Sequence, residues 1–235
     1  MACESEIKAI DEEKEEKVEE KTEEVEEMER TQAGVLVLRK LPEFQMDAYD
    51  PKTGKYIKVS SADYKGRWLV VCFYPADFTF VCPTEIAAMN AKYDELQKMG
   101  VEVLAVSTDT VYSHKRFAET EPLLKDLKIV IGADPTGEVS RKFGVLIEDA
   151  GIALRGRFLV NPDGVIVAEE VQGPSVGRNV NEFIRQIQAW QHVYKTGEAC
   201  PANWRPGKKT LPVNTKAEEL TGKVGDYVTL DEILS

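Results

Sequence analysis

The chain has few of the residues that build metal centres and disulfide frameworks. Its 235 residues include four cysteines and two histidines, and no two cysteines form a Cys-x-x-Cys pair. Structural zinc sites usually take their ligands from closely spaced pairs, and small secreted folds are much richer in cysteine. We therefore expect no metal, and we expect thiols rather than structural disulfides.

Long apolar runs are also missing. The most apolar stretch, residues 68–74, is far shorter than the ~20 residues of a membrane-spanning helix. Met1 is followed by acidic residues, whereas a signal peptide begins with a basic segment and an apolar run. These absences predict a cytoplasmic protein without a membrane partner.

Excess negative charge is confined to one end of the chain. The formal charge is −11, of which residues 1–30 contribute −9, so the rest of the chain is nearly neutral at −2. A protein that binds a phosphate backbone usually has a strongly basic surface. Nucleic acid is therefore not an expected partner.

The acidic end, residues 1–33, has a helical pattern. It contains no glycine or proline, and several glutamates lie four residues before a lysine or arginine, which supports a helix. A thin apolar stripe along it is interrupted by Lys14 and Lys21. Two interpretations remain open: a solvated or disordered extension, or a helix that docks on a partner subunit.

Residues 34–195 alternate between strand and helix patterns, which predicts one α/β domain with a mixed central sheet flanked by helices. Hairpins are expected at both ends of this region, where turns contain proline and glycine. The expected strands are 44–49, 55–59, 68–74, 101–106, 129–131, 157–160 and 165–168, and the expected helices are 83–98, 111–118, 137–143 and 179–194.

The segment between residue 74 and the next helix has the composition of a reactive site. Pro83 is typical of a first helical turn, so Cys82 should lie at the helix N-terminus, where unpaired amides and the macrodipole favour a thiolate. Thr79 would share that side if the segment turns tightly. These residues alone leave both a reactive and a buried structural thiol open.

The remaining thiols and both imidazoles carry weaker signals. Cys72 lies inside an apolar strand and is expected to pack in the core, and Cys3 lies in no motif. His192 falls on the polar side of the last helix and should be solvated, while His114 has no evident catalytic partner. A cysteine–histidine hydrolase is therefore unsupported.

Residues 73–85 contain Pro75, Thr79 and Cys82 in the order Pro-x3-Thr-x2-Cys, which closely resembles the peroxidatic signature of typical two-cysteine peroxiredoxins. The resemblance runs from about residue 35 to residue 211. The stretches around Cys82 and Cys200 are most similar to the bacterial peroxidase subunits of alkyl hydroperoxide reductases. It implies a thioredoxin-like fold and no cofactor. Further matching stretches are 107–110, 134–137, 152–156, 176–179 and 197–204.

The resemblance implies complementary roles for two cysteines. Cys82 would attack the peroxide and become a sulfenic acid. Cys200, in the tail 196–235, looks like the resolving cysteine, which in this family comes from the partner subunit and forms an intersubunit disulfide. Implied partners are a hydroperoxide, a thioredoxin-like or flavoprotein disulfide reductase, and further copies of the chain in a homodimer and a decameric ring.

The resemblance also implies a group of residues around the peroxidatic thiol. Arg155 would lower its pKa and stabilise charge on the leaving oxygen. Thr79 would hydrogen-bond the thiolate and the peroxide, and Pro75 would shield the site from water. Glu85 and Arg178 would orient the arginine. Taken singly, each of these residues could equally be a turn proline or a solvated charge.

Two other functions are compatible with the same fold. A thiol-disulfide oxidoreductase is disfavoured because Thr79 stands where a Cys-x-x-Cys motif would have its first cysteine. A holdase chaperone is conceivable because the family forms rings.

Peroxide-sensitive members of the family carry a Gly-Gly-Leu-Gly insertion and a C-terminal Tyr-Phe pair. In this chain residues 123–129 contain no glycine, and Tyr227 precedes Val228. Resistance to overoxidation is therefore expected.

Overall fold

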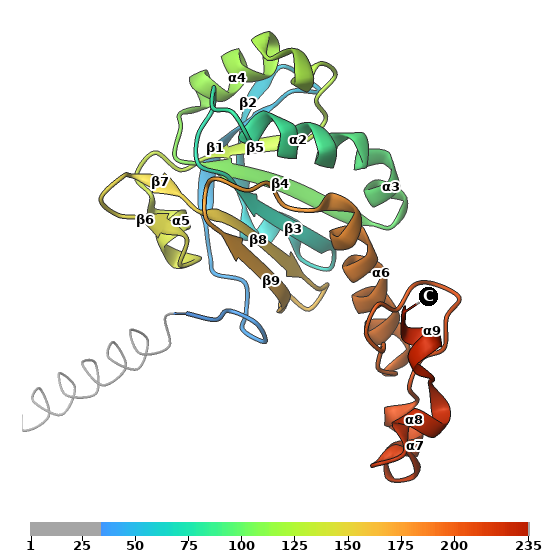
Figure 1. The fold of residues 1–235 in the computed structure, drawn as a ribbon. Coiled ribbons are helices and arrows are strands. Elements are labelled where there is room, and N and C mark those ends of the chain that lie inside the picture. Colours follow the sequence, from blue (N-terminus) through green and yellow to red (C-terminus); the bar gives the residue numbers. More distant parts are fainter. Residues whose placement is uncertain (1–33, 235) are drawn as a thin grey trace, which may run out of the picture. The chain divides into compact units, whose positions relative to one another are not determined.

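The computed structural model describes residues 34–234 (Figure 1). The residues from Val37 onward form one compact unit. The expected helical extension over residues 1–33, including Cys3, lies outside the described residues. Among the described residues, no helix combines the length and the apolarity needed to cross a bilayer.

A seven-stranded mixed sheet forms the centre of the unit, as predicted. Its order is β2-β1-β5-β4-β3-β8-β9; the central pairs β3/β4 and β4/β5 are parallel, and the others are antiparallel. Both predicted hairpins are present at the ends of the sheet. The strands are β1 (Gln45–Asp50), β2 (Lys55–Ser60), β3 (Trp68–Phe73), β4 (Val101–Ser107), β5 (Val130–Ala133), β8 (Arg155–Val160) and β9 (Ile166–Gln172).

Helices flank the sheet (Figure 1). Asn179 caps the long helix α6 by accepting a hydrogen bond from the Glu182 amide at 3.1 Å, and Gly197 ends it in the left-handed region at φ 71°. The helices are α2 (Cys82–Ala91), α3 (Tyr93–Lys98), α4 (Val111–Thr120), α5 (Glu138–Lys142), α6 (Val180–Thr196), α7 (Val213–Leu220), α8 (Val224–Tyr227) and α9 (Leu230–Leu234).

Strand β3 separates two apolar layers. Its odd and even positions point to opposite faces. Val70 and Tyr74 join α2, α3 and α6 in the main core. Phe73, on the other face, packs at 5.0 Å from Phe143 and 5.9 Å from Phe158, measured between ring centroids. Burial on both faces explains why this strand is apolar throughout.

The structure corrects several predicted elements. The single helix expected over residues 83–98 is broken at Lys92, whose φ of −98° and ψ of 2° leave the helical region, and the new direction allows both Tyr93 and Leu96 to be buried in α3. The structure also contains elements that the sequence did not predict: the hairpin of β6 (Leu146–Ile147) and β7 (Ile152–Ala153), whose strands have two residues each, and the helices α7, α8 and α9.

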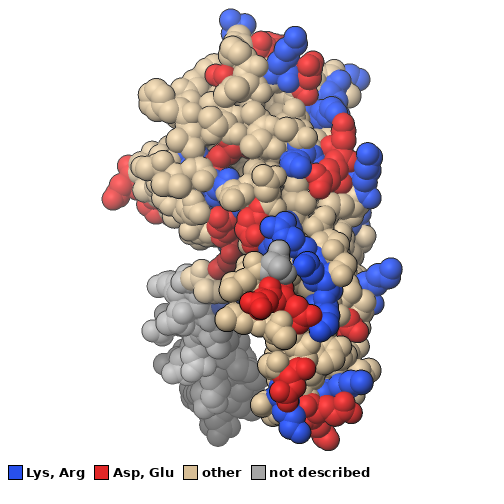
Figure 2. All heavy atoms as spheres, turned by 45° about the vertical axis from the view of Figure 1, so that its right-hand side comes forward, with Lys and Arg blue, Asp and Glu red and all other residues tan. Residues whose placement is uncertain are grey.

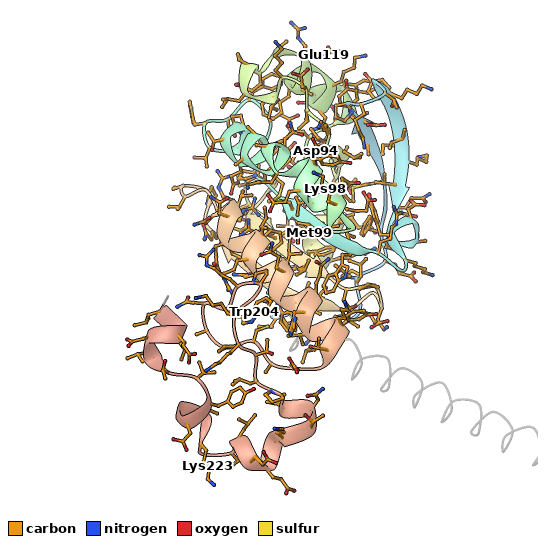
Figure 3. The ribbon with its side chains drawn as sticks, turned by 90° about the vertical axis from the view of Figure 1, so that its right-hand side faces the viewer. Asp94, Lys98, Met99, Glu119, Trp204 and Lys223 are labelled. Carbon is orange, nitrogen blue, oxygen red and sulfur yellow. The ribbon has the colours of Figure 1, made fainter. Side chains whose placement is uncertain are left out.

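The segment after α6 folds back on that helix. Ala199 and Leu211 form a β-bridge with two 2.8 Å hydrogen bonds, which closes the loop between them. Trp204 in this loop is buried and its ring centroid lies 5.0 Å from that of His192 on α6. Figure 3 shows Trp204 at the junction between α6 and the C-terminal helices.

Gly137 should be the less replaceable of two glycines with the same backbone geometry. Gly137 and Gly164 have φ of 69° and 72°, but a Cβ at Gly137 would lie 2.8 Å from a methyl carbon of Leu146, whereas a Cβ at Gly164 would meet nothing within 4 Å. Left-handed strain of roughly 1 kcal/mol should affect both alanine variants, and the clash should add about 1 kcal/mol in Gly137→Ala. Urea unfolding measures both; equal losses would contradict the packing.

Candidate active site

Cys82 is the first residue of α2, with Pro83 directly after it in the first turn. The thiol is fully buried. The predicted position at the positive end of a helix is therefore correct. Burial alone does not decide between a reactive and a structural thiol, so the surroundings of the sulfur carry the argument.

Arg155, the first residue of β8, supplies a cation beside this sulfur. Its Nη1 lies 3.5 Å from Cys82 Sγ and 2.6 Å from Glu85 Oε2, and its Nε donates to the carbonyl oxygen of Pro174 at 2.9 Å. The side chain is only 3% exposed. A guanidinium held this close in a water-poor site places a positive charge next to the sulfur.

Glu85 joins Arg155 to Arg178. Arg178 donates to Glu85 Oε1 from its backbone amide at 2.7 Å and from Nε at 2.8 Å, and its Nη2 lies 3.1 Å from Oε2. Burial would raise the pKa of Glu85, but the hydrogen bonds and charge of Arg178, with the charge of Arg155, lower the pKa overall. Glu85 is thus an ionised carboxylate between two buried cations.

Arg178 also fixes the strands around the site. Its Nη1 donates to the carbonyl oxygen of Gly156 at 2.7 Å, and its Nη2 donates to that of Phe73 at 3.0 Å. One side chain therefore bonds to β8, to the end of β3 and to α2. Four residues expected to act together, Cys82, Arg155, Glu85 and Arg178, come from three separate elements and meet here.

Pro75 and Thr79 lie in the loop before α2. Pro75 is buried and Thr79 is half-buried. The Thr79 hydroxyl donates to the carbonyl oxygen of Ala76 at 2.9 Å, which closes the turn. Within the described residues that donation is local, so in this structure the Cys82 sulfur is not the acceptor of the Thr79 hydroxyl.

A buried network that the sequence did not reveal lies beneath this loop. His114 is fully buried, with Nδ1 at 2.9 Å from Asp77 Oδ2 and Nε2 at 3.2 Å from the carbonyl oxygen of Gly132. The Tyr74 hydroxyl donates to Asp77 Oδ1 at 2.7 Å. His114 therefore has structural hydrogen-bond partners. The available signal was its three-residue spacing from the buried Phe117 on α4.

Asp77, Asp109 and His114 are also the one described group of histidine and acidic side chains whose ligand atoms lie close enough together to hold a cation, within 4.8 Å of one another. Asp109 Oδ2 already accepts from the amide of Asp77 at 2.9 Å. The remaining ligand atoms have the hydrogen bonds given above. The three side chains therefore stabilise the loop through these hydrogen bonds.

Cys200 does not meet Cys82 within one chain. It is half-buried against α6, with Sγ 3.7 Å from the carbonyl oxygen of Ala189. Burial raises the pKa of the Cys200 thiol, although the charge of Arg185 lowers it. Ala189 is nine residues along α6 from the end near Arg178, about 14 Å of helix. Cys72, Cys82 and Cys200 are all free thiols.

His192 differs from its expected solvated state. The side chain is 28% exposed, and Nε2 lies 3.4 Å from Glu198 Oε2. It lies against Trp204 rather than in open solvent because the C-terminal loop folds over this part of α6. The amphipathic pattern of the helix could not reveal that cover.

Replacing Glu85 with glutamine should destabilise the fold strongly and in a pH-dependent way. Two buried arginines would lose their counter-ion, a loss of about 3 kcal/mol at neutral pH. Because the pKa of Glu85 in the folded state is below its ordinary 4.5, its stabilisation is present above that value and is lost as pH falls through the folded pKa. The difference between wild type and Glu85→Gln should therefore shrink in acid.

Urea unfolding at pH 7 and at steps below pH 4.5 measures this gap. Glu138→Gln is the matched control, because Glu138 also pairs with a cation, Lys142 at 2.8 Å, but is exposed. Its effect should be small at every pH. A Glu85→Gln deficit that does not change with pH would contradict the ionised state of the carboxylate.

Comparisons with known proteins agree with this geometry. Residues 37–169 match the model of the AhpC/TSA family, and residues 189–227 match that of the C-terminal domain of 1-Cys peroxiredoxin. The chain is 42% identical over 190 residues to alkyl hydroperoxide reductase C of Staphylococcus aureus, an alignment that covers 80% of this chain and 99% of the relative.

Solved structures give the same answer. Enterococcus faecalis AhpC aligns with a TM-score of 0.68 and 41% identity, over 72% of this chain and all of that one. The reduced 2-Cys peroxiredoxin of Plasmodium vivax aligns with a TM-score of 0.72 and 33% identity, over 75% of this chain and 93% of that one. The family model spans more than half of the chain, and the relatives align over nearly their whole length. The chain therefore belongs to the AhpC/TSA family and is a peroxiredoxin, a thiol-dependent peroxidase with a thioredoxin-like fold.

Proposed function

We propose that Cys82 is the peroxidatic cysteine and that it reduces hydrogen peroxide and organic hydroperoxides. The carrying observation is the 3.5 Å approach of Arg155 Nη1 to the buried Sγ at the start of α2. The thiolate attacks one peroxide oxygen, the O–O bond breaks, and the leaving alkoxide or hydroxide takes up a proton. The products are a Cys82 sulfenic acid and an alcohol or water.

Arg155 stabilises charge on the leaving oxygen in this step. Its position is fixed before substrate arrives, since Glu85 and the Pro174 carbonyl already hold it. A donor fixed in advance costs no reorganisation during the reaction. Thr79, whose hydroxyl donates to Ala76, keeps lone pairs that accept the peroxide O–H, and buried Pro75 keeps water from the sulfur.

Cys200 of the partner subunit then resolves the sulfenic acid, releasing water and forming an intersubunit disulfide. The separation of Cys82 and Cys200 within one chain supports this. Cys82 must first leave its buried position, and α2 is suited to that, since its N-cap residue Val81 offers no side-chain hydrogen bond to the first turn.

The remaining partners follow from the same cycle. A thioredoxin-like or flavoprotein disulfide reductase supplies two electrons and two protons to the disulfide. The catalytic domain comprises residues 34–195, and the tail 196–235 carries the resolving cysteine. The protein is a cytoplasmic homodimer that assembles into a decameric ring. Acidic and basic side chains lie among one another on the face in Figure 2, which supports the absence of a nucleic-acid partner.

Separate serine variants should divide the cycle into its two steps. Cys82→Ser should abolish peroxide turnover because it removes the nucleophile. Cys200→Ser should keep one rapid oxidation of Cys82 but lose the disulfide and therefore recycling by a thioredoxin-like donor. Stopped-flow peroxide consumption and non-reducing gels measure these effects.

Cys3→Ser is the control for both variants, because Cys3 lies in no matched motif. It should keep turnover and the peroxide-dependent dimer band. A dimer band that persists in Cys200→Ser would contradict the assignment of the resolving cysteine.

We expect Cys82 to resist overoxidation because the contacts of the C-terminal helices leave the first turn of α2 free to open. The C-terminal helices bond to the loop after α6: Asn214 donates to the Thr196 carbonyl at 2.9 Å, and Lys209 pairs with Glu232 at 2.7 Å. Nothing in these contacts holds the first turn of α2 closed. Mass spectrometry of Cys82 during turnover should therefore detect sulfinic acid only at higher peroxide than in a sensitive relative assayed alongside. Equal sensitivity would defeat the expectation.

A further inference from the structure

A second cysteine, Cys72, lies beside an arginine of strand β8, as Cys82 does. It lies on β3 directly opposite Arg157 in the antiparallel register, so both side chains share one face of the sheet. Arg157 is two residues after Arg155 and therefore also shares its face. Cys72 packs against the core, as expected, although it is half-buried rather than fully enclosed.

One hydrogen-bond donor of Arg157, its buried Nε, has no acceptor among the described residues. The guanidinium is 2% exposed, stacks 3.9 Å above the Phe183 ring, and uses Nη2 to bond Glu170 and the Asn179 carbonyl. An unpaired donor of a buried cation is costly and rare, so it indicates an acceptor that the reduced site lacks.

A second cation also faces this sulfur. Burial lowers the pKa of Arg157, although its interactions with Cys72 and Glu170 act in the opposite sense. The pKa of Arg178 is raised against the effect of burial by its interactions with Cys72 and Glu85. Cys72, Arg178 and Glu85, together with mostly apolar side chains such as Ile86 and Val103, line a cavity of about 10 Å³, the lower limit of the room that one water molecule needs.

We propose that Cys72 is a second oxidation site, at which peroxide converts the thiolate to a sulfinate held by Arg157 and Arg178. In the first step one peroxide transfers an oxygen to sulfur, giving a sulfenate and water. A second peroxide gives the sulfinate and another water. Each step oxidises sulfur by two electrons and reduces one peroxide, the substrate of this family. The new oxygens accept the hydrogen bond that Arg157 Nε lacks.

Oxidation of Cys72 would act on the active site through Arg178. That guanidinium bonds Glu85, which in turn holds Arg155 against Cys82. An anion at Cys72 competes with Glu85 for Arg178 and loosens this chain of contacts. Cys72 oxidation therefore slows the reaction of Cys82 at high peroxide, although Cys72 never touches the substrate of Cys82.

A direct test oxidises the full-length Cys82→Ser/Cys200→Ser protein with increasing hydrogen peroxide and follows each cysteine by peptide mass spectrometry. Cys72 should reach the sulfinic acid at lower peroxide than Cys3, the reference thiol of the same chain. Arg157→Lys, which keeps the charge but not the Nε–H, should slow this oxidation. Sulfinylation of Cys3 before Cys72 would overturn the proposal, independently of the roles assigned to Cys82 and Cys200.

A second test needs no oxidation, because an aspartate imitates the size and charge of a sulfinate. Cys72→Asp should be at least as resistant to urea as the neutral Cys72→Asn, and its Cys82 should react with peroxide several-fold more slowly. Val70→Asp is the matched control: Val70 is buried on the same face of β3 but lies opposite Leu159 rather than an arginine. It should be strongly destabilised. A Cys72→Asp protein less stable than Cys72→Asn, or as reactive as wild type, would overturn the proposal.

Discussion

The structure around the active site depends on one carboxylate, Glu85, buried between two guanidinium groups. Two cations and one anion leave a single uncompensated positive charge in a site where water cannot screen it. Arg178 bonds to Glu85 and to two carbonyl oxygens, and the guanidinium of Arg155 lies 3.5 Å from the sulfur. A negative charge on the Cys82 sulfur, as the proposed reaction requires, would neutralise the cluster.

The sheet and the loop give this cluster its rigidity. Arg178 bonds to the carbonyl of Gly156 in β8 and to that of Phe73 at the end of β3, and Glu85 comes from α2. Beneath the loop, the buried contact of Asp77 with His114 holds the chain between β3 and α2. Each of these polar groups is paired, which is what allows charged side chains to remain in an apolar domain.

Enclosure of the sulfur and access to it place opposite demands on α2. A dry site strengthens the influence of Arg155, yet the proposed disulfide requires Cys82 to come out and meet a thiol held elsewhere. The N-cap residue Val81 offers no side-chain hydrogen bond to the first turn, whereas Glu85, in that same turn, is anchored by Arg178. The cluster resists unwinding of this turn, so its strength bears on the balance between resolution and overoxidation.

Strong local signals in the sequence were enough to predict both hairpins, the apolar strands, the long helix α6, and Cys82 at a helix start before Pro83. The motif between Pro75 and Cys82 also indicated the family. The break at Lys92, the burial of His114, and the half-buried Cys72 opposite Arg157, whose Nε is unpaired, became visible only in the folded chain. These features depend on contacts between residues far apart in the chain, whereas propensity and periodicity report only on neighbours within a few turns.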